Sequence, residues 1–387
     1  MKIGIDCRTI LNPEKGEGAG IGHYTYQLVR HLLKIDQKNT YLLFFDRTVQ
    51  PRRLAKFQQA NAIIKFFPFL QYSKFLPNVY RHHLVNAFLS REKLDIFHSP
   101  TLSLPTSYQG LAVATAHDLA IYKFPELYPP KQISFLKTEI FQAIKQAKKI
   151  IAVSESTKKD LGEIFGLPAE KIKVIANGLD ERFFKKSSPE EIDRVKKKYG
   201  LKDNYILFLG TLDARKNIIR IVEAYERLIA RTNQFSQYQL VLAGQIGKQS
   251  DEIKKRIDES KYRSDIILPG YIEADDLDPL FESAKIFLFP SLYEGFGLPV
   301  IEAMANGVPV ITSNISSLPE VAKGHALLVD PFNVADITQS LVQLLTDQDL
   351  YQDLSKNGKK RAQEFTWEKA ARETLKFYQE VIVGNMK

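Results

Sequence analysis

The stretch 290–307 reads Pro290-Ser-Leu-Tyr-Glu294-Gly-Phe-Gly297-Leu-Pro299-Val-Ile-Glu302-Ala-Met-Ala-Asn-Gly307. It follows an apolar run that ends at Phe289, as a strand, a glycine-containing turn and a helix would. Pro299 suits the first helical turn, which does not need its missing N–H, and Gly307 suits the helix end. The first N–H groups of such a helix have no intrahelical partner, so they form a cradle for phosphate or sugar oxygens. The stretch predicts a β-turn-α unit with a ligand at the carboxyl end of its strand.

Two carboxylates accompany this cradle. Helical side chains lean toward the N-terminus, so Glu302, in the second turn of the helix, should point back toward the site that Glu294 lines. Such a pair suits the vicinal hydroxyls of a hexose and a ribose. The alternative is that Glu294 caps the turn and Glu302 is a solvated helix residue, although the rest of this helix is apolar.

Short runs rich in Val, Ile and Phe recur along the chain with helical stretches between them, which indicates an α/β fold with doubly wound, mostly parallel sheets. The first series of expected strands covers Lys2 to Asp6, Tyr41 to Phe45, Ala62 to Phe66, Asp95 to His98, Leu111 to Ala116, Ile150 to Val153 and Ile172 to Ala176. The second covers Tyr205 to Leu209, Gln239 to Ala243, Asp265 to Leu268, Ile286 to Phe289, Val308 to Thr312 and Ala326 to Val329.

At 387 residues the chain is too long for one ordinary core. The break between the two strand series predicts an N-terminal Rossmann-like domain over 1–180 and a C-terminal one over 181–366, facing each other across a cleft. A final helix over 367–387 is a candidate to pack back on the N-terminal domain. Ligands of such sheets bind at the carboxyl ends of the strands.

Composition restricts the class of protein further. No stretch approaches the roughly 20 apolar residues of a membrane span, and the N-terminus lacks the apolar region of a secretory signal, so we expect a cytoplasmic protein. Cys7 is the single cysteine, which excludes an intrachain disulfide and a cysteine-based zinc site. A net charge of +9 favours an anionic partner without choosing among nucleotides, lipid headgroups and nucleic acid.

A cationic segment lies upstream of the carboxylates. The run Phe208-Leu-Gly210-Thr-Leu-Asp-Ala-Arg215-Lys216-Asn217 ends a strand and opens a helix. The compact ammonium of Lys216 and the planar fork of Arg215 suit a diphosphate leaving group. The alternative is a solvated helix start.

A glycine-rich loop follows the first strand. It reads Gly16-Glu-Gly18-Ala-Gly20-Ile-Gly22 and precedes a helix with an apolar stripe. Its glycines would let the backbone approach a bound anion. A dinucleotide-binding loop is the competitor, with Asp46 as its ribose acid, but the required glycine spacing is not met. A plain flexible turn stays open.

His117 and Asp118 end another apolar strand, so His117 should lie at the carboxyl edge of the first sheet. A lone histidine is more often structural than functional. Ser154 and Glu155 follow the next strand and suit a helix start, with Ser154 as the cap.

Taken together, Glu294 and Glu302 around Gly-Phe-Gly-Leu-Pro, with the flank Asn-Gly-Val-Pro-Val-Ile-Thr-Ser, resemble the paired-glutamate motif of the retaining GT-B glycosyltransferases of family 4. The resemblance covers nearly the whole chain and is strongest over 205–335. It implies a reaction centre with His117, Arg215, Lys216 and Glu294. It also implies donor contacts from Gly20, Ile21, Gly22, Asp118, Gly210, Thr211, Tyr271, Ile272, Gly295, Phe296, Gly297, Leu298 and Glu302.

Within that set, the resemblance gives the donor sugar to Glu294, the 295–298 amides and His117, the ribose to Glu302, and the diphosphate to Lys216. The nucleobase falls near Tyr271, which is nearly as well explained as an ordinary half-buried aromatic. Many relatives carry Arg directly after the glycine at 210, where this chain has Thr211, and Arg215 is the candidate to replace that charge.

The implied activity is metal-independent transfer of a hexose from a nucleotide-diphosphate sugar, with the departing phosphate oxygen accepting the proton of the acceptor. No cofactor is expected. Similarity to bacterial mannosyl- and rhamnosyltransferases favours GDP-mannose as the donor and a glycan or lipid-linked acceptor in polysaccharide assembly. GDP-glucose, UDP-glucose and UDP-N-acetylglucosamine stay open as donors.

Three other functions stay open. A GT-B fold also houses epimerases and phosphorylases. An NAD-dependent oxidoreductase would need a working dinucleotide loop, and a nucleic-acid-binding protein would need a recognition motif, which the dispersed basic residues do not provide.

One further segment, 66–93, interleaves aromatic and basic residues. Such a stretch suits peripheral contact with an anionic membrane, here the inner face, or a packed helix with a solvated basic face.

Overall fold

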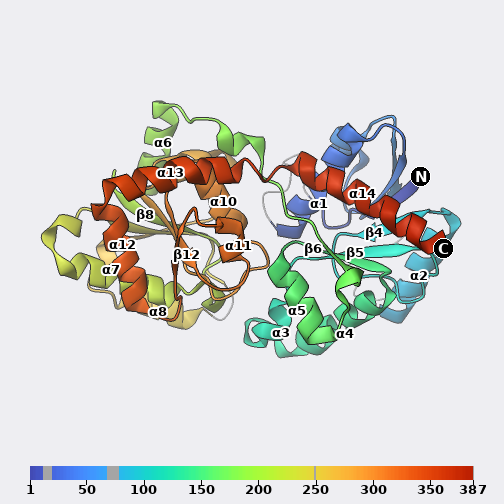
Figure 1. Ribbon diagram of the computed structural model, residues 1–387, viewed down its shortest axis with the longest axis horizontal. Helices are drawn as coiled ribbons and strands as arrows, with labels where there is room; N and C mark the ends of the chain where they lie inside the picture. Colours follow the sequence, from blue (N-terminus) through green and yellow to red (C-terminus); the bar gives the residue numbers. More distant parts are fainter. Residues whose placement is uncertain (12–19, 68–77, 248–249, 387) are drawn as a thin grey trace. The chain divides into compact units, whose positions relative to one another are not determined.

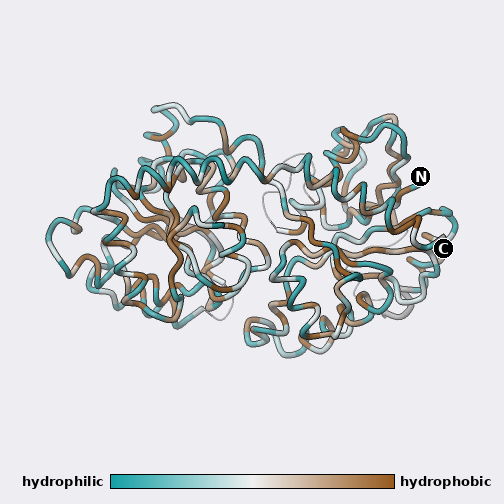
Figure 2. Tube along the Cα trace, in the orientation of Figure 1, coloured by the Kyte–Doolittle hydropathy of each residue, from teal (hydrophilic) through white to brown (hydrophobic). Residues whose placement is uncertain are grey.

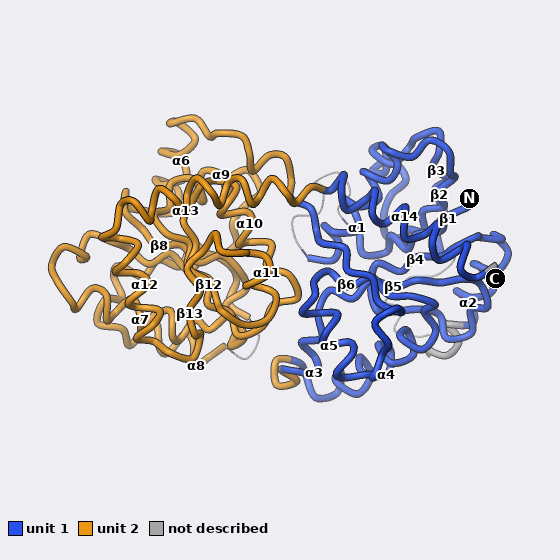
Figure 3. Tube along the Cα trace, in the orientation of Figure 1, with its two compact units in different colours: residues 1–123, 128–178, 367–387 blue, residues 124–127, 179–366 orange. Residues whose placement is uncertain are grey.

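The computed structural model describes residues 1–11, 20–67, 78–247 and 250–386. Within these, the chain forms two compact units (Figure 3). Unit 1 comprises 1–123, 128–178 and 367–387, and unit 2 comprises 124–127 and 179–366.

Unit 1 is built on a seven-stranded parallel sheet (Figure 1). Its strands are β1 (Lys2–Asp6), β2 (Thr40–Phe45), β3 (Ala62–Phe66), β4 (Ile96–Ser99), β5 (Ala112–Ala116), β6 (Lys149–Ala152) and β7 (Ile172–Val174), in the order β3-β2-β1-β4-β5-β6-β7. Its helices are α1 (Gly20–Ile35), α2 (Asn78–Arg91), α3 (Ala120–Lys123), α4 (Pro130–Gln146), α5 (Glu155–Phe165) and α14 (Trp367–Met386).

Unit 2 repeats this plan with six parallel strands. They are β8 (Tyr205–Leu209), β9 (Gln239–Ala243), β10 (Ile266–Gly270), β11 (Ile286–Phe289), β12 (Val310–Ser313) and β13 (Leu327–Val329), in the order β10-β9-β8-β11-β12-β13. The helices are α6 (Pro189–Tyr199), α7 (Ile218–Arg231), α8 (Asp251–Asp258), α9 (Ala274–Glu282), α10 (Leu298–Ala305), α11 (Leu318–Ala322), α12 (Val334–Thr346) and α13 (Gln348–Ala362). Both sheets confirm the predicted doubly wound α/β class, and each predicted strand is found within two residues of its expected bounds.

Apolar side chains cover both faces of the sheet in unit 1, which explains why its strands are continuous apolar runs. Ile3 and Ile5 of β1 face one core with α1 and α14, whereas Leu42 and Phe44 of β2 face the other. Figure 2 shows hydrophobic strands in the interior of the unit and more hydrophilic helices around them. Helix α14 lies along α1 and buries Trp367, Phe377 and Tyr378 in the first of these cores.

The strand order places one switch point in each sheet, where connections leave in opposite directions from neighbouring strands. In unit 1 it lies between β1 and β4, and in unit 2 between β8 and β11. Ligands of open α/β sheets bind in the crevice outside the carboxyl ends of such strands. A ligand-binding site is therefore expected in the segments that follow these four strands.

Candidate functional site

The loop after β11 carries Glu294 and leads into α10. Gly297 is the residue before the helix and adopts φ 104°, a left-handed conformation that glycine accepts at little cost. A Cβ at this position would lie 2.7 Å from Cδ2 of Leu318. Pro299 lies in the first turn of α10, as the sequence predicts. The loop therefore has a fixed geometry that delivers the free N–H groups of the helix start to the carboxyl edge of the sheet.

Glu294 is paired with two cations from the segment after β8. Its Oε1 accepts a hydrogen bond from Nζ of Lys216, and its Oε2 lies 3.1 Å from Nη1 of Arg215. Arg215 also donates to the backbone carbonyl of Tyr293 at 2.8 Å. Both Glu294 and Lys216 are buried, at 8% and 7% exposure. Lys216 is thus not the solvated helix residue of the alternative interpretation.

Burial and pairing act in opposite directions on these charges. Burial raises the pKa of Glu294, but Lys216 and Arg215 outweigh it, so the net pKa is lowered and Glu294 is ionised at neutral pH. Burial lowers the pKa of Lys216, and the attraction of Glu294 only partly offsets that effect. Asp213, whose Oδ2 lies 4.0 Å from Nη2 of Arg215, brings a second carboxylate to the two cations, so the charges of the cluster balance. An anionic ligand would compete with these carboxylates for the two cations.

A short 3-10 turn over Ala214–Lys216 aims the cations. The carboxylate of Asp213 accepts from the N–H of Lys216 at 3.1 Å, and Asn217 adopts the left-handed conformation at φ 63°. The amide of Asn217 then donates to the carbonyls of Pro290 and Pro331, at 3.0 and 2.7 Å. Asn217 therefore ties the cationic turn to the segment after β11.

Two serines hold the Glu294 loop from the far side, and sequence reasoning missed both. The Glu294 N–H donates to Oγ of Ser316 at 3.0 Å, and the Ser316 hydroxyl donates back to the Glu294 carbonyl at 2.6 Å. The Ser317 hydroxyl lies 2.8 Å from the carbonyl of Phe296. Ser316 has φ 61°, a strained value for a residue with a side chain. A Ser-Ser pair just before a helix start was the available signal.

Glu302 lies on α10 and is half-buried. Charged side chains near it come from α9, which carries Asp278, and from the 3-10 turn at Glu181–Phe184, which carries Arg182. Burial, opposed by Arg182 and assisted by Asp180 and Asp278, raises its pKa to about 8. The pKa of Asp278 is raised to about 6, again mainly by burial. Glu302 is therefore not a freely solvated helix residue, and a hydroxyl-bearing ligand would supply hydrogen-bond partners for its carboxyl group.

The remaining predicted residues of unit 2 lie along the same sheet edge. Gly210 follows β8, and a Cβ at this position would lie 3.4 Å from Cζ of Phe208 and 3.7 Å from Cε of Lys216. Thr211 beside it is exposed. Past β10, Tyr271 is 60% exposed and Ile272 is buried. Tyr271 is thus more exposed than an ordinary half-buried aromatic, and it is available to a planar ligand.

In unit 1, only part of the predicted glycine loop lies within the described residues. Gly16 and Gly18 lie outside the described residues. Gly20, Ile21 and Gly22 form the first turn of α1 rather than a loop, and Gly20, where the helix begins, has the left-handed φ of 69° that glycine accepts. An N–H cradle at a helix start is still what this segment offers to an anion.

His117 and Asp118 follow β5 at the carboxyl edge of the unit 1 sheet. His117 Nε2 lies 2.9 Å from the carbonyl of Pro100, which follows β4. Burial lowers the pKa of His117, so the ring is neutral at pH 7. The carboxylate of Asp118 accepts from the N–H of Ala120 at 2.9 Å and so caps the short helix α3. Ser154 likewise caps α5, accepting from Thr157, as predicted.

Two family profiles match the chain, one for each unit. "Glycosyl transferases group 1" matches residues 189–361, and "Glycosyltransferase Family 4" matches residues 18–183. The first includes Arg215, Lys216, Glu294 and Glu302, and the second includes His117.

Curated relatives and solved structures agree with these profiles. The chain is 31% identical over 375 residues to an O-antigen chain mannosyltransferase B of Escherichia coli, covering 95% of this chain and 97% of the relative. Its fold matches sucrose-phosphate synthase from Thermosynechococcus elongatus with a TM-score of 0.75, 20% identity and 99% of both chains covered. It also matches HepE of Anabaena, solved with UDP and glucose, with a TM-score of 0.74, 18% identity, and 98% and 100% covered.

Proposed function

The chain belongs to the family 4 glycosyltransferases and is a GT-B hexosyltransferase of glycan assembly, and we propose that it transfers mannose from GDP-mannose to a glycan or lipid-linked acceptor with retention of configuration. The observation that carries this proposal is the buried Arg215–Lys216–Glu294 cluster beside the start of α10, at the switch point of the unit 2 sheet. The mannosyltransferase of Escherichia coli, related along nearly its full length, supports mannose as the sugar.

In this proposal Lys216 and Arg215 bind the diphosphate, and Glu294 with the amides of 295–298 binds the sugar. Glu302 accepts hydrogen bonds from the ribose hydroxyls, and Tyr271 lies against the base. Arrival of a diphosphate gives both cations a new anionic partner, which frees the Glu294 carboxylate to accept from a sugar hydroxyl. His117 contacts another hydroxyl of the donor sugar.

The chemistry requires little from side chains beyond positioning and charge. The acceptor oxygen bonds to the anomeric carbon as the bond from that carbon to the phosphate oxygen breaks, and the departing phosphate oxygen takes the acceptor proton. Lys216, Arg215 and the loop amides stabilise the negative charge that develops on the diphosphate, the kind of electrostatic stabilisation that preorganised donors provide. No step in this scheme uses a metal ion or a cofactor.

The test is an assay with GDP-mannose and a series of mannosylated and lipid-linked acceptors, in buffer containing EDTA. The α-anomer of a new mannoside, identified by NMR, would support both retention and metal independence. A β-linked product, a requirement for added divalent ions, or transfer only from UDP-sugars would each overturn the corresponding part of the proposal. Release of an epimerised nucleotide sugar without transfer would instead favour the epimerase alternative.

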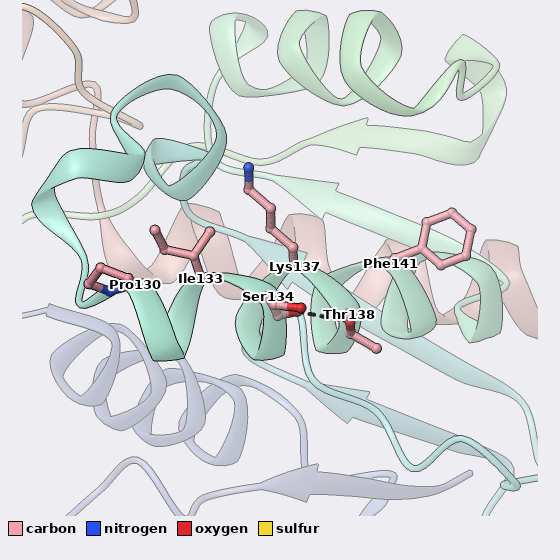
Figure 4. Close-up of a pocket in the computed structure, with 6 residues that line it drawn as sticks. All are labelled: Pro130, Ile133, Ser134, Lys137, Thr138 and Phe141. Carbon is pink, nitrogen blue, oxygen red and sulfur yellow. Dashed lines mark hydrogen bonds between the residues drawn. The ribbon is translucent and has the colours of Figure 1, made fainter.

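We also propose that unit 1 touches an anionic membrane, which would bring the enzyme to a lipid-linked acceptor. The predicted segment 66–93 lies partly outside the described residues, but α4 offers a second surface (Figure 4). A groove runs along one face of this helix, lined by Pro130, Ile133, Ser134, Lys137, Thr138 and Phe141. Phe141 and Phe135 are 53% and 40% exposed.

Exposed Lys131 and Lys145 accompany these apolar groups on α4. Exposed aromatics with flanking lysines are the combination that binds the headgroup region of an anionic bilayer. Among the residues described, no helix is both long and apolar enough to cross a membrane.

Sedimentation with vesicles tests this surface. The protein should sediment with vesicles that contain phosphatidylglycerol and not with pure phosphatidylcholine. Phe141→Ser should weaken sedimentation, whereas Phe332→Ser, which removes an equally exposed phenylalanine from unit 2, should not. Equal binding by both variants would reject α4 as the contact.

A further inference from the structure

The orientation of His117 follows from its hydrogen bond. Its Nε2 lies 2.9 Å from the carbonyl oxygen of Pro100, and a carbonyl can only accept, so Nε2 carries the proton. Because the ring is neutral, Nδ1 is left with a lone pair and can only accept a hydrogen bond. His117 is therefore prepared to receive a hydroxyl proton and not to donate one.

A single hydrogen bond still leaves the ring free to pivot, and a chain of aromatic rings removes that freedom. Tyr24 of α1 packs edge-on against His117, with ring centroids 4.6 Å apart and an interplanar angle of 81°. On the other side of Tyr24 lies Trp367, the first residue of α14, at 5.7 Å and 66°. Both Tyr24 and Trp367 are buried, at 4% and 2% exposure.

A buried chain of polar groups also holds Tyr24 through its hydroxyl. The Tyr24 hydroxyl lies 3.4 Å from Oγ1 of Thr115, and that oxygen lies 2.8 Å from Nε2 of His98. Nδ1 of His98 lies 2.6 Å from the hydroxyl of Tyr378, again on α14. Burial lowers the pKa of His98 to about 3, so this link stays uncharged.

Polar groups buried in a core are costly unless all are satisfied, and a satisfied network makes its surroundings rigid. Here the network and the ring chain both start on α14 and meet at Tyr24, whose ring packs against His117 at the carboxyl end of β5. An apolar core would hold α14 in place equally well, but it would not orient an imidazole.

We propose that Tyr24 and Trp367 are positioning residues that fix the acceptor nitrogen of His117 toward a hydroxyl of the donor sugar, so that α14 completes the site in unit 1. The inference rests on the proposed role of His117 in binding the donor sugar. It assigns Tyr24 and Trp367 no contact with the substrate.

The test replaces the Tyr24 ring at nearly constant bulk. Tyr24→Met should lower kcat/KM for GDP-mannose at least tenfold, while the Kd for GDP, which has no sugar, stays within twofold of wild type. Tyr24→Phe keeps both ring contacts and loses only the 3.4 Å contact with Thr115, the longest link of the network, so both quantities should stay within threefold of wild type. If Tyr24→Met does not fold, Trp367→Leu with Trp367→Phe as its control makes the same comparison.

Histidine ring NMR gives a second readout that a purely structural role would not move. The His117 resonances, assigned with His117→Gln, should show the Nε2–H tautomer in wild type and in Tyr24→Phe, and a shifted pKa or mixed tautomer in Tyr24→Met. Unchanged resonances and unchanged kcat/KM in Tyr24→Met would overturn the inference. Wild-type turnover in His117→Gln would overturn the role of His117 itself, which separates the two failures.

Discussion

Lys216 is the residue on which the proposed chemistry depends most, because its ammonium is buried against Glu294 and Phe289. Its Nζ lies 4.8 Å from the Phe289 ring centroid, so few water molecules can solvate the charge. Lys216→Met keeps most of the apolar stem and removes the charge. We expect kcat to fall by about 10²- to 10³-fold, the usual loss when one preorganised charge-stabilising donor is removed.

Lys254→Met, on the exposed face of α8, is the matched control and should retain wild-type turnover. Circular dichroism of both variants checks that the fold is kept. A Lys216→Met enzyme with wild-type kcat would remove the diphosphate role from this residue.

The raised pKa of Glu302 predicts that the free energy of unfolding depends on pH. Its pKa rises on folding from 4.5 to about 8, and that of Asp278 beside it from 3.8 to about 6, both mainly through burial. Between these values the folded protein binds more protons than the unfolded chain, so the free energy of unfolding decreases as the pH rises. Arg182 and Asp180 also face this group but do not reverse the sign.

Thermal unfolding of wild type and Glu302→Gln between pH 5 and pH 8 measures this effect. The Tm of wild type should fall with pH relative to that of Glu302→Gln, which cannot ionise. Glu252→Gln, an exposed residue of α8, should follow wild type. Parallel curves for wild type and Glu302→Gln would contradict the raised pKa.

For individual residues, the sequence predicts the strand end at which a residue lies better than it predicts the side chains that the residue contacts. Lys216 and Glu294 are 78 residues apart, yet both follow strands that a doubly wound order makes neighbours, so their proximity was foreseeable. The contacts of Tyr24 with Trp367, and of Ser316 with the Glu294 loop, were not. These contacts depend on how helices and loops pack in three dimensions, and neither hydrophobic periodicity nor motif spacing in the sequence predicts such packing.

Among the elements, the strand-loop-helix unit from β11 to α10 makes the sharpest prediction. Gly297→Ala would force a side chain into the left-handed region and into Leu318. We expect a loss of about 1–3 kcal/mol in the free energy of unfolding, together with weaker donor binding, because the loop must move.

The control is Gly384→Ala, in α14, where a Cβ would meet nothing within 4 Å. That change should alter stability by about 1 kcal/mol or less, in the stabilising direction expected of alanine in a helix. Chemical denaturation of the two variants provides the comparison. A neutral Gly297→Ala would show that the loop is not held as described.

The elements themselves were largely predictable, because buried parallel strands are continuous apolar runs and stand out from amphipathic helices. The exception is the start of α1. Four alternating glycines indicated a loop, but the last two, Gly20 and Gly22, lie inside the first helical turn. Glycine has a weak helical preference, which the buried face of α1, with Leu28, Val29, Leu32 and Leu33, overrides.

For the whole molecule, the two units are alike in plan and different in what they offer. At one sheet edge, unit 2 presents Lys216 and Arg215, the carboxylate of Glu294, the carboxyl group of Glu302 and a helix start, which together suit a nucleotide sugar. Unit 1 presents a neutral histidine braced by the first and last helices, and an exposed face on α4. The central claim is that the edge of unit 2 binds the donor through Lys216.

Thermal unfolding with nucleotide sugars tests that claim most directly, since a ligand that binds only the folded state raises the Tm. GDP-mannose should raise the Tm of wild type more than UDP-glucose or UDP-N-acetylglucosamine does, and should leave the Tm of Lys216→Met unchanged at the same concentration. No increase with any nucleotide sugar, or an equal increase in Lys216→Met, would contradict the account.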